Sequence, residues 1–443
     1  MTSSTAVHSN AFNFMSFIES GVDPRTGQYT LAINLPALQS YDLNGPEFPI
    51  SLSYNPLNTT HSGYGLGWDL KLSQYTPATG ILALSTGETF KSTATEGGRL
   101  VFKEQKLDSF RCFVDGNGWY RVVHKSGLVE YLQEQGIAGY QVALPRYVES
   151  PQGHRLQLDY QPFGNFLRLA TVRDDSSVLL QISIDGKLVH IDQRPGAAED
   201  GGAWARYTLQ LGAGDRVDRI SLPSTPASSW RFTYELAKGM LILKTISSPT
   251  GAVETLEYLD DGHVFPDGSS AADQLTDDGE PLSLLAREAR ERFELGRRQR
   301  SGESPAVTQA RAAAKARPPL PRVTRHVTDP GFGQPVIEVR YTYTLDGNPS
   351  IHNFLGAGLS DVIFEDDGLD NIYKTRTAYR YGSVETLWVA GVAVRSITRT
   401  FNRYHLLIEE STQQNDSIKR VVTRYHITDQ TTALPRPPLT SDT

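Results

Sequence analysis

Short runs in which apolar and polar residues alternate recur along the whole chain and are separated by turn-forming residues. One such run is Tyr29 to Ile33, and another is Phe48 to Tyr54. A period of two is typical of β-strands that bury one face. The first run follows Asp-Pro-Arg-Thr-Gly at residues 23–27, where proline fixes φ and glycine accepts the positive φ of a tight turn. The pattern predicts an all-β chain of short strands joined by turns.

A degenerate repeat of one hairpin unit follows a first region of hairpins. Two copies share a proline, a glycine two residues later and a tyrosine nine residues after the proline: Pro151, Gly153 and Tyr160, then Pro249, Gly251 and Tyr258. A looser copy spans residues 219–234, and another runs through Pro330 to Tyr341 and Tyr343. Such hairpins cannot bury their apolar face alone, so we expect them to stack side by side into a curved antiparallel sheet.

Three glycines spaced by two, Gly63, Gly65 and Gly67, precede Trp68. On a strand, this spacing would leave one face without side chains, so that another backbone or the ring of Trp68 could pack closely. A phosphate-binding loop is the alternative interpretation. The pattern disfavours it, because alternating Leu70 and Leu72 follow instead of a helix.

Residues 261–320 break the β pattern. This stretch is charged, it holds a run from Leu282 to Phe293 that fits a short helix, and an arginine-rich part follows. A solvated surface insertion, partly helical and partly disordered, fits it better than a site for nucleic acid or an acidic partner. After it, we expect strands at 336–343, 373–381, 386–394, 394–401, 406–410 and 418–425. The chain then divides into a flexible amino terminus (1–11), an amino-terminal hairpin region (12–145), hairpin repeats (146–260), the charged insertion (261–320), further hairpins (321–430) and a flexible tail (431–443).

Composition narrows the functional classes. The 443 residues carry a net charge of −7, and this mild acidity disfavours nucleic acid as the main partner. The only cysteine, Cys112, excludes an intrachain disulfide framework and is expected to be a structural thiol. No apolar run approaches the roughly 18 residues of a transmembrane segment. The first residues lack the basic start and apolar stretch of a secretory signal, so we expect synthesis in the cytoplasm.

Candidate chemistry is sparse. The sequence contains no nucleophile elbow, no His-Glu-x-x-His and no phosphate-binding Walker motif, so we predict neither catalytic residues nor a cofactor. Asp366, Asp367 and Asp370 form the densest carboxylate group and are a weak calcium candidate. A polar hairpin tip explains them better, because the EF-hand spacing is absent. Tyrosines at strand ends could serve as carbohydrate platforms, but packing in the repeat already accounts for them.

The opening motifs resemble those of the Rhs/YD-repeat polymorphic toxins and are similar to the shell-forming B/C-type components of insecticidal toxin complexes. They read NFMSFIESGVDPRTGQYTLAINLPALQ from residue 13, FPISLSYNPL from 48, SGYGLGWDLKLSQY from 62 and LSTGETFK from 84. Later, NFLGAGLSDVIFEDDGLDNIY and RTFNRYHLL also read like such repeats. The resemblance covers residues 12–260 and 320–430, and its opening part is the most specific.

The resemblance implies a sheet that spirals into a hollow cocoon around a toxic effector domain, in a protein exported by a dedicated secretion system. The wall of such a cocoon is not catalytic. Full shells of the family are longer, and its aspartate-dependent self-cleavage element is not visible here, since Asp329-Pro330-Gly331 lies inside a repeat hairpin. We therefore expect the amino-terminal part of a shell, a truncated member or one half of a split shell.

An open sheet edge would then need a protein partner that completes the shell, or self-association. One alternative is a glycan-binding or cell-surface β-repeat protein, which would expose aromatic side chains along a groove. Another is a carbohydrate-active enzyme, which would need two carboxylates facing each other in a pocket.

Overall fold

The computed structural model describes residues 20–58, 60–103, 105, 108–237, 240–263, 320–345, 380–402 and 406–425. The expected tails (1–11 and 431–443), residues 264–319 of the expected insertion and the calcium candidates Asp366, Asp367 and Asp370 lie outside this part of the chain. Within it the structure is built from antiparallel strands, which confirms the predicted all-β class. None of its helices has the length and apolar character to cross a membrane.

A small four-stranded sheet, which we call the inner sheet, comes first in the chain. Its strands pair in sequence order and are β1 (Ser20–Val22), β2 (Tyr29–Leu38), β3 (Phe48–Tyr54) and β4 (Trp68–Leu70). The 3-10 turn η2 (Tyr41–Leu43) lies between β2 and β3. Residues of β3 alternate between buried and less buried positions, as the period of two predicted.

The next eight strands form a closed ring. They are β5 (Gln74–Thr76), β6 (Ile81–Ala83), β7 (Thr89–Glu96), β8 (Arg99–Phe102), β9 (Phe110–Gly116), β10 (Trp119–His124), β11 (Val129–Gln135) and β12 (Val142–Glu149). Each pairs with the next, and β12 returns to β5 where Ala143 faces Tyr75. One end of β12 therefore closes the ring, and its other end pairs with the first strand of the following sheet.

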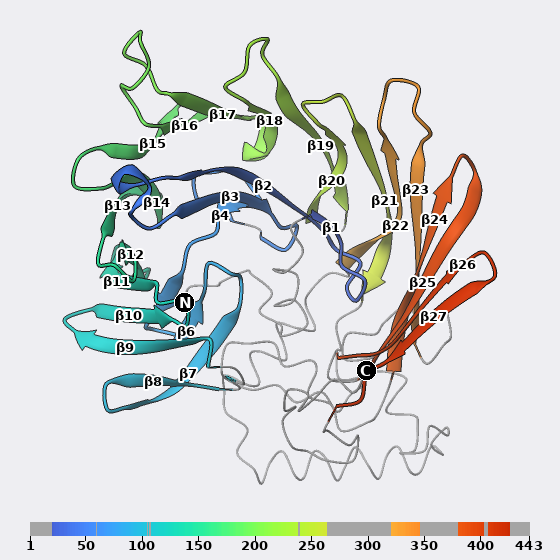
Figure 1. Ribbon diagram of the computed structural model, residues 1–443, viewed down its shortest axis with the longest axis horizontal. Helices are drawn as coiled ribbons and strands as arrows, with labels where there is room; N and C mark the ends of the chain where they lie inside the picture. Colours follow the sequence, from blue (N-terminus) through green and yellow to red (C-terminus); the bar gives the residue numbers. More distant parts are fainter. Residues whose placement is uncertain are drawn as a thin grey trace.

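From β12 onwards the strands run as an open, curved meander. They are β13 (Arg155–Phe163), β14 (Phe166–Arg173), β15 (Val178–Asp185), β16 (Leu188–Gln193), β17 (Ala205–Leu211), β18 (Val217–Ser221), β19 (Ser229–Ala237), β20 (Met240–Ser247), β21 (Val253–His263), β22 (Leu320–Asp329), β23 (Ile337–Leu345), β24 (Arg380–Val389), β25 (Val392–Asn402), β26 (Leu407–Gln414) and β27 (Ser417–Val422). Figure 1 shows this meander as an arc that bends around the inner sheet.

The predicted hairpin turns are present. Gly153 and Gly251 both have positive φ and close the β12–β13 and β20–β21 turns with hydrogen bonds to Ser150 and Ser248. Pro330 starts the longer β22–β23 turn. The strand expected at 386–394 is wrong, because the chain turns at Ala390 and Gly391, both with positive φ, and separates β24 from β25.

At several places in the repeat region a short ladder lies next to a long one. β12 pairs with β13 only over Tyr147–Glu149, next to the turn, whereas β13 pairs with β14 from Gln157 to Phe163. In the same way, β20 pairs with β21 only over Thr245–Ser247, whereas the β21–β22 ladder extends along nearly the whole of β21. In each short pair, the two strands are hydrogen-bonded next to their turn and diverge beyond it. We call such a diverging pair of strands a V.

A bulge marks the point where each V opens. The residues left without a register partner are Arg146, Asp218, Lys244, Thr324 and Ile408. A bulge inserts one residue into a single strand, which bends that strand and increases its twist. These bulges lie on β12, β18, β20, β22 and β26, so their bends add up along the meander.

A tyrosine hydroxyl bridges the V at each of these bulges, and we call these contacts the tyrosine rungs. In every case the hydroxyl donates to the carbonyl immediately before the bulged residue. The pairs are Tyr160 with Pro145 (2.9 Å), Tyr234 with Val217 (2.8 Å), Tyr258 with Leu243 (2.9 Å), Tyr343 with Val323 (3.0 Å) and Tyr425 with Leu407 (2.9 Å). The rungs fix how far each V opens.

The repeat tyrosines lie inside their strands and not at the strand ends, where the sequence placed them. Tyr160, Tyr258 and Tyr343 lie within their strands and make rungs, while Tyr341 lies two residues before a rung and is buried in the core.

Two apolar clusters form the core. The larger one lies between the inner sheet and the concave face of the meander, and the smaller one fills the ring. Cys112 is fully buried in the ring, and this burial raises the pKa of its thiol to about 12. The thiol is therefore protonated at neutral pH, as a structural cysteine should be.

The rungs predict a specific stability effect. Replacing Tyr258 by Phe keeps the ring but leaves the Leu243 carbonyl without its donor in a buried place. We expect the free energy of unfolding to fall by about 1–3 kcal/mol, measured from the midpoint of urea unfolding.

Tyr207→Phe on β17 is the matched control, since its hydroxyl makes no hydrogen bond within the described residues. It should change stability by less than about 0.5 kcal/mol. Equal effects of the two substitutions would show that the rungs do not brace the wall.

Candidate functional site

The candidate functional site is the concave face of the meander, which we call the concave wall, together with the inner sheet that docks on it (Figure 1). The contact is partly apolar and partly a set of buried hydrogen bonds. Several of these hydrogen bonds fall where the ladders of the meander are interrupted. The geometry of each one follows from a motif of the opening sequence.

The first motif is the turn at residues 23–28, between β1 and β2. The Gly27 amide donates to the Asp23 carbonyl (2.8 Å), and the Asp23 amide donates to the Gln28 carbonyl (3.0 Å). Arg25 pairs with the Asp23 carboxylate at 2.9 Å, and both side chains are almost fully buried. A buried charge is tolerated when it is paired and hydrogen-bonded, so this pair holds the turn in one shape.

This docking turn fits into the V between β22 and β23. The Val323 amide donates to the Gly27 carbonyl at 2.8 Å, and the Gln28 side chain donates to the Pro321 carbonyl at 2.6 Å. Gly27 has a φ of +67°, and a Cβ built on it would lie 2.5 Å from the Cβ of Arg322 and 2.7 Å from the hydroxyl of Tyr343. Only glycine therefore fits at this contact.

The glycines before Trp68 lie in a loop, not on the predicted strand. Gly65 and Gly67 both have positive φ, which a β-strand does not use, and β4 begins only at Trp68. The close approach is nevertheless present. A Cβ on Gly65 would lie 2.5 Å from Val217, and one on Gly67 would lie 2.9 Å from the ring of Tyr54. The adjacent Leu66 amide donates to the Asp215 carbonyl, at 2.8 Å, in the 3-10 turn η3 (Ala213–Asp215).

Trp68 connects the inner sheet to a rung. Its ring is fully buried, and its indole N–H donates to the hydroxyl of Tyr234 at 3.0 Å. That hydroxyl in turn donates to the Val217 carbonyl. Tyr54 lies beside it, with ring centroids 5.7 Å from Trp68, and donates to the Leu241 carbonyl at 2.8 Å. Both aromatic side chains thus combine large apolar burial with a satisfied polar group.

A carboxylate on the wall receives two further donors. Glu254 of β21 accepts from the Tyr29 hydroxyl at 3.0 Å and from His326 Nε2 at 2.8 Å, both on the same oxygen. Burial alone would raise the pKa of Glu254, but the hydrogen bond and charge of His326 and the hydrogen bond of Tyr29 together hold this pKa below its ordinary value. The contact between β2 and the wall is therefore favoured by the ionised carboxylate.

Charged side chains continue along the concave wall beyond the docking turn. Arg399 bridges Glu385 and Glu410, each at 2.9 Å, across three neighbouring strands. Next to the docking turn, the guanidinium of Arg322 lies 4.4 Å from the ring centroid of Tyr343. Burial lowers the pKa of Arg322 to about 10. The wall thus changes from apolar, where the inner sheet covers it, to polar in its last strands.

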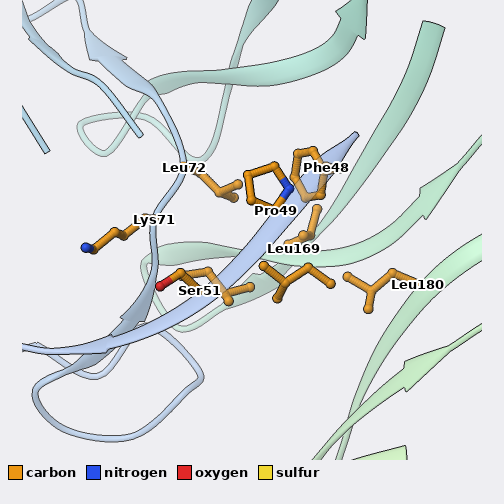
Figure 2. Close-up of a pocket in the computed structure, with 9 residues that line it drawn as sticks. Phe48, Pro49, Ser51, Lys71, Leu72, Leu169 and Leu180 are labelled. Carbon is orange, nitrogen blue, oxygen red and sulfur yellow. The ribbon is translucent and has the colours of Figure 1, made fainter. Parts of the chain in front are cut away.

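A small cleft lies in the seam between the inner sheet and the wall. Figure 2 shows Phe48, Pro49 and Leu72 facing Leu169 and Leu180 of β14 and β15. Its free volume of about 10 Å³ is close to the least that one water molecule needs. In the described part of the chain, no group of three or more His, Cys, Asp or Glu side chains could hold a metal ion.

Several functional residues were not identified from the sequence. Gln28, Glu254 and the bulged residues carry no distinctive local pattern, because their roles depend on partners far away in the chain. Tyr54 and Tyr29 were placed on strands, but only the docked geometry shows their hydroxyls reaching the wall.

The docking turn provides a test. Gly27→Ala should lower the free energy of unfolding by more than the about 1–2 kcal/mol that a positive φ alone costs an alanine, because the new methyl also overlaps Arg322 and Tyr343. It should also make β1 and β2 more sensitive to limited proteolysis. Gly186→Ala is the control, since Gly186 has a φ of +56° with nothing within 4 Å of the added Cβ. Equal losses would contradict a tight docking contact.

The Glu254 contact predicts a pH dependence. Because the folded-state pKa is lowered, the stabilisation is present above the ordinary value of 4.5 and is lost as the pH falls through the lower folded pKa. The difference in melting temperature between the unmodified chain and Glu254→Gln should therefore shrink below about pH 4.5. Glu199→Gln, at an exposed site, serves as the control. A difference that stays constant from pH 7 to pH 3 would contradict this.

Comparisons with known proteins give weak likenesses only. No protein-family model matches the sequence, and no curated protein matches it significantly. Among solved structures, a Tc holotoxin pore from Photorhabdus luminescens is 11% identical with a TM-score of 0.30, over 57% of this chain and 16% of that chain. The complex TcdB2-TccC3 without its hypervariable C-terminal region is 12% identical with a TM-score of 0.30, over 55% of this chain and 16% of that chain. A porin-like protein from Bacteroides uniformis is 12% identical with a TM-score of 0.24, over 51% of this chain and 90% of that chain. These TM-scores are too low to define the fold or the function of the chain, which spans 16% of each Tc chain.

Proposed function

We propose that this chain is a non-catalytic wall segment of a toxin-related protein shell, which helps to enclose or deliver an effector domain. Two lines of reasoning support the proposal. The opening motifs resemble those of Rhs/YD-repeat shells, and in the structure these same motifs brace a curved sheet. Export by a dedicated secretion system follows from the resemblance alone and is part of the proposal.

The observation that carries the proposal is the open, curved meander with its five tyrosine rungs. A sheet that is bent by recurring bulges and covered on one face by an inner sheet has the construction of a wall. The residues that the motifs contribute, such as Gly27 and Trp68, lie at contacts that hold the curvature. Their placement accounts for the motifs without a catalytic role.

The last described strand supports a partner that continues the wall. At each of the first four rungs, the strand that carries the tyrosine pairs on its far edge with a further strand, namely β14, β20, β22 or β24. The fifth rung uses Tyr425, just after β27. Register pairs join β27 to β26, and within the described strands none joins its other edge. An exposed edge of this kind is a template for strand addition.

The side chains of β27 fit this role. All six of its residues are exposed, including Ile418, which is 67% exposed, and Val421. Apolar side chains on an edge strand favour pairing with another chain, whereas Lys419 and Arg420 on the same strand limit unspecific pairing. We therefore expect a protein partner that adds a strand to β27.

The test is co-purification of the full chain with the products of neighbouring genes, followed by measurement of the mass of the complex. We expect a stable heteromer, and we expect the double variant Ile418→Lys and Val421→Lys to weaken it at least about tenfold, because charges on an edge oppose pairing. Val392→Lys is the control, since Val392 is 63% exposed at the β24–β25 turn, away from this edge. A monodisperse monomer with hydrolytic turnover would overturn the proposal.

A further inference from the structure

A row of large side chains crosses the outer face of β9 to β12 in the closed ring and continues onto β13, the first strand of the meander. Register partners place Phe113, Arg121, Tyr131, Tyr147 and Gln157 in line, one each from β9 to β13. The row therefore crosses the strands, with a spacing of about 4.8 Å from one strand to the next.

Aromatic rings and guanidinium groups pack against each other along this row. The rings of Trp119 and Tyr147 are parallel within 8°, with centroids 6.1 Å apart. The guanidinium of Arg155 lies 5.0 Å from the Tyr131 ring and 5.9 Å from the Tyr147 ring, and that of Arg121 lies 5.1 Å from the Phe113 ring. We call the four rings of Phe113, Trp119, Tyr131 and Tyr147 the aromatic platform.

The platform does not belong to the core. The residues that alternate with it, such as Cys112, Val122 and Leu132, are fully buried on the other face and fill the ring. None of the four platform rings is part of either core cluster, and each is partly exposed. A contiguous group of partly exposed aromatic side chains on one sheet face is a candidate interaction surface.

The charges on this face are neutralised locally. Arg121 makes a bidentate pair with Asp115, at 3.0 and 3.1 Å, and Arg155 pairs with Glu149. The hydrogen bonds to these carboxylates raise the pKa of both arginines. Binding of nucleic acid depends on cationic side chains that are available to neutralise phosphates. The paired charges therefore favour an uncharged ligand.

The backbone beneath the platform is fully engaged in the sheet. β10 and β11 each pair with a strand on both edges, and β12 pairs with β11, β13 and β5. A peptide that adds as a strand needs a free edge, which these strands do not offer. A ligand on this face must therefore be recognised through side chains alone.

We propose that the aromatic platform is a binding site for a neutral oligosaccharide. Ring faces suit the C–H faces of pyranose sugars, and the amides of Gln133 and Gln157 together with the arginine–carboxylate pairs offer donors and acceptors for hydroxyl groups. Two strand spacings, about 10 Å, are close to the length of one disaccharide unit. The four rings of the platform lie on strands of the closed ring, and the site does not depend on the shell function proposed for the meander.

The test uses the full chain in titration calorimetry with cellohexaose, hexa-N-acetylchitohexaose and maltoheptaose as neutral probes. We expect at least one of them to bind and to change tryptophan fluorescence. Trp119→Ala and Tyr147→Ala should each weaken binding at least about tenfold, since each removes one stacking surface. Trp204→Ala is the matched control, because Trp204 is 63% exposed on the β16–β17 loop, away from the platform, and binding should not change.

Melting curves of every variant show whether it is folded. Trp119→Phe keeps an aromatic ring at this position, so it should retain part of the affinity, while the change in tryptophan fluorescence should be lost. The proposal is overturned if no neutral probe binds at millimolar concentration, or if binding survives both alanine variants. It is also overturned if heparin, oligo-deoxythymidine or a polyproline peptide binds more tightly than every neutral probe, since that result would assign the face to another class of ligand.

Discussion

The hydrogen bond between a tyrosine hydroxyl and the carbonyl before a β-bulge is the interaction on which the rest of the structure depends. A bulge alone would bend the sheet but leave its ladder interrupted at a buried place. At Val217, Leu243 and Val323 the interruption coincides with a hydroxyl from the neighbouring strand. At these three positions the wall can therefore curve without losing the buried hydrogen bond, because the neighbouring strand supplies a tyrosine.

The inner sheet uses the same interruptions. Val323 donates its amide to Gly27 and accepts from Tyr343 through its carbonyl, so one residue joins the rung and the docking turn. Trp68 likewise binds the hydroxyl that already bridges to Val217. Curvature and docking are thus coupled physically. If the V pairs diverged by a different amount, the Val323 amide and the Tyr234 hydroxyl would lie out of reach of the inner sheet. Docking of the inner sheet therefore holds the wall at one curvature.

The sequence predicted those parts whose cause is local. Pro151 with Gly153 and Pro249 with Gly251 specify turns by their own φ preferences, and the alternation specified strands. The turn at Ala390 and Gly391 was hidden by an unbroken small and apolar run from Val389 to Val394. Ring closure through Ala143 and Tyr75, the separate inner sheet and the bulges depend on residues far apart in the chain. A period of two shows that one face is buried but not what buries it, so these features could not be predicted.

The two ends of the large sheet are not equivalent, and this asymmetry follows from the pairing. At one end, the strands β5 to β12 close on themselves, so each has a partner on both edges. At the other end β27 is paired to β26, and Figure 1 places it on the opposite side of the molecule from the ring. A ring without free edges cannot template further strands. Among the described strands of the large sheet, a template for strand addition is therefore available at β27, where the pairing stops, and not at the ring.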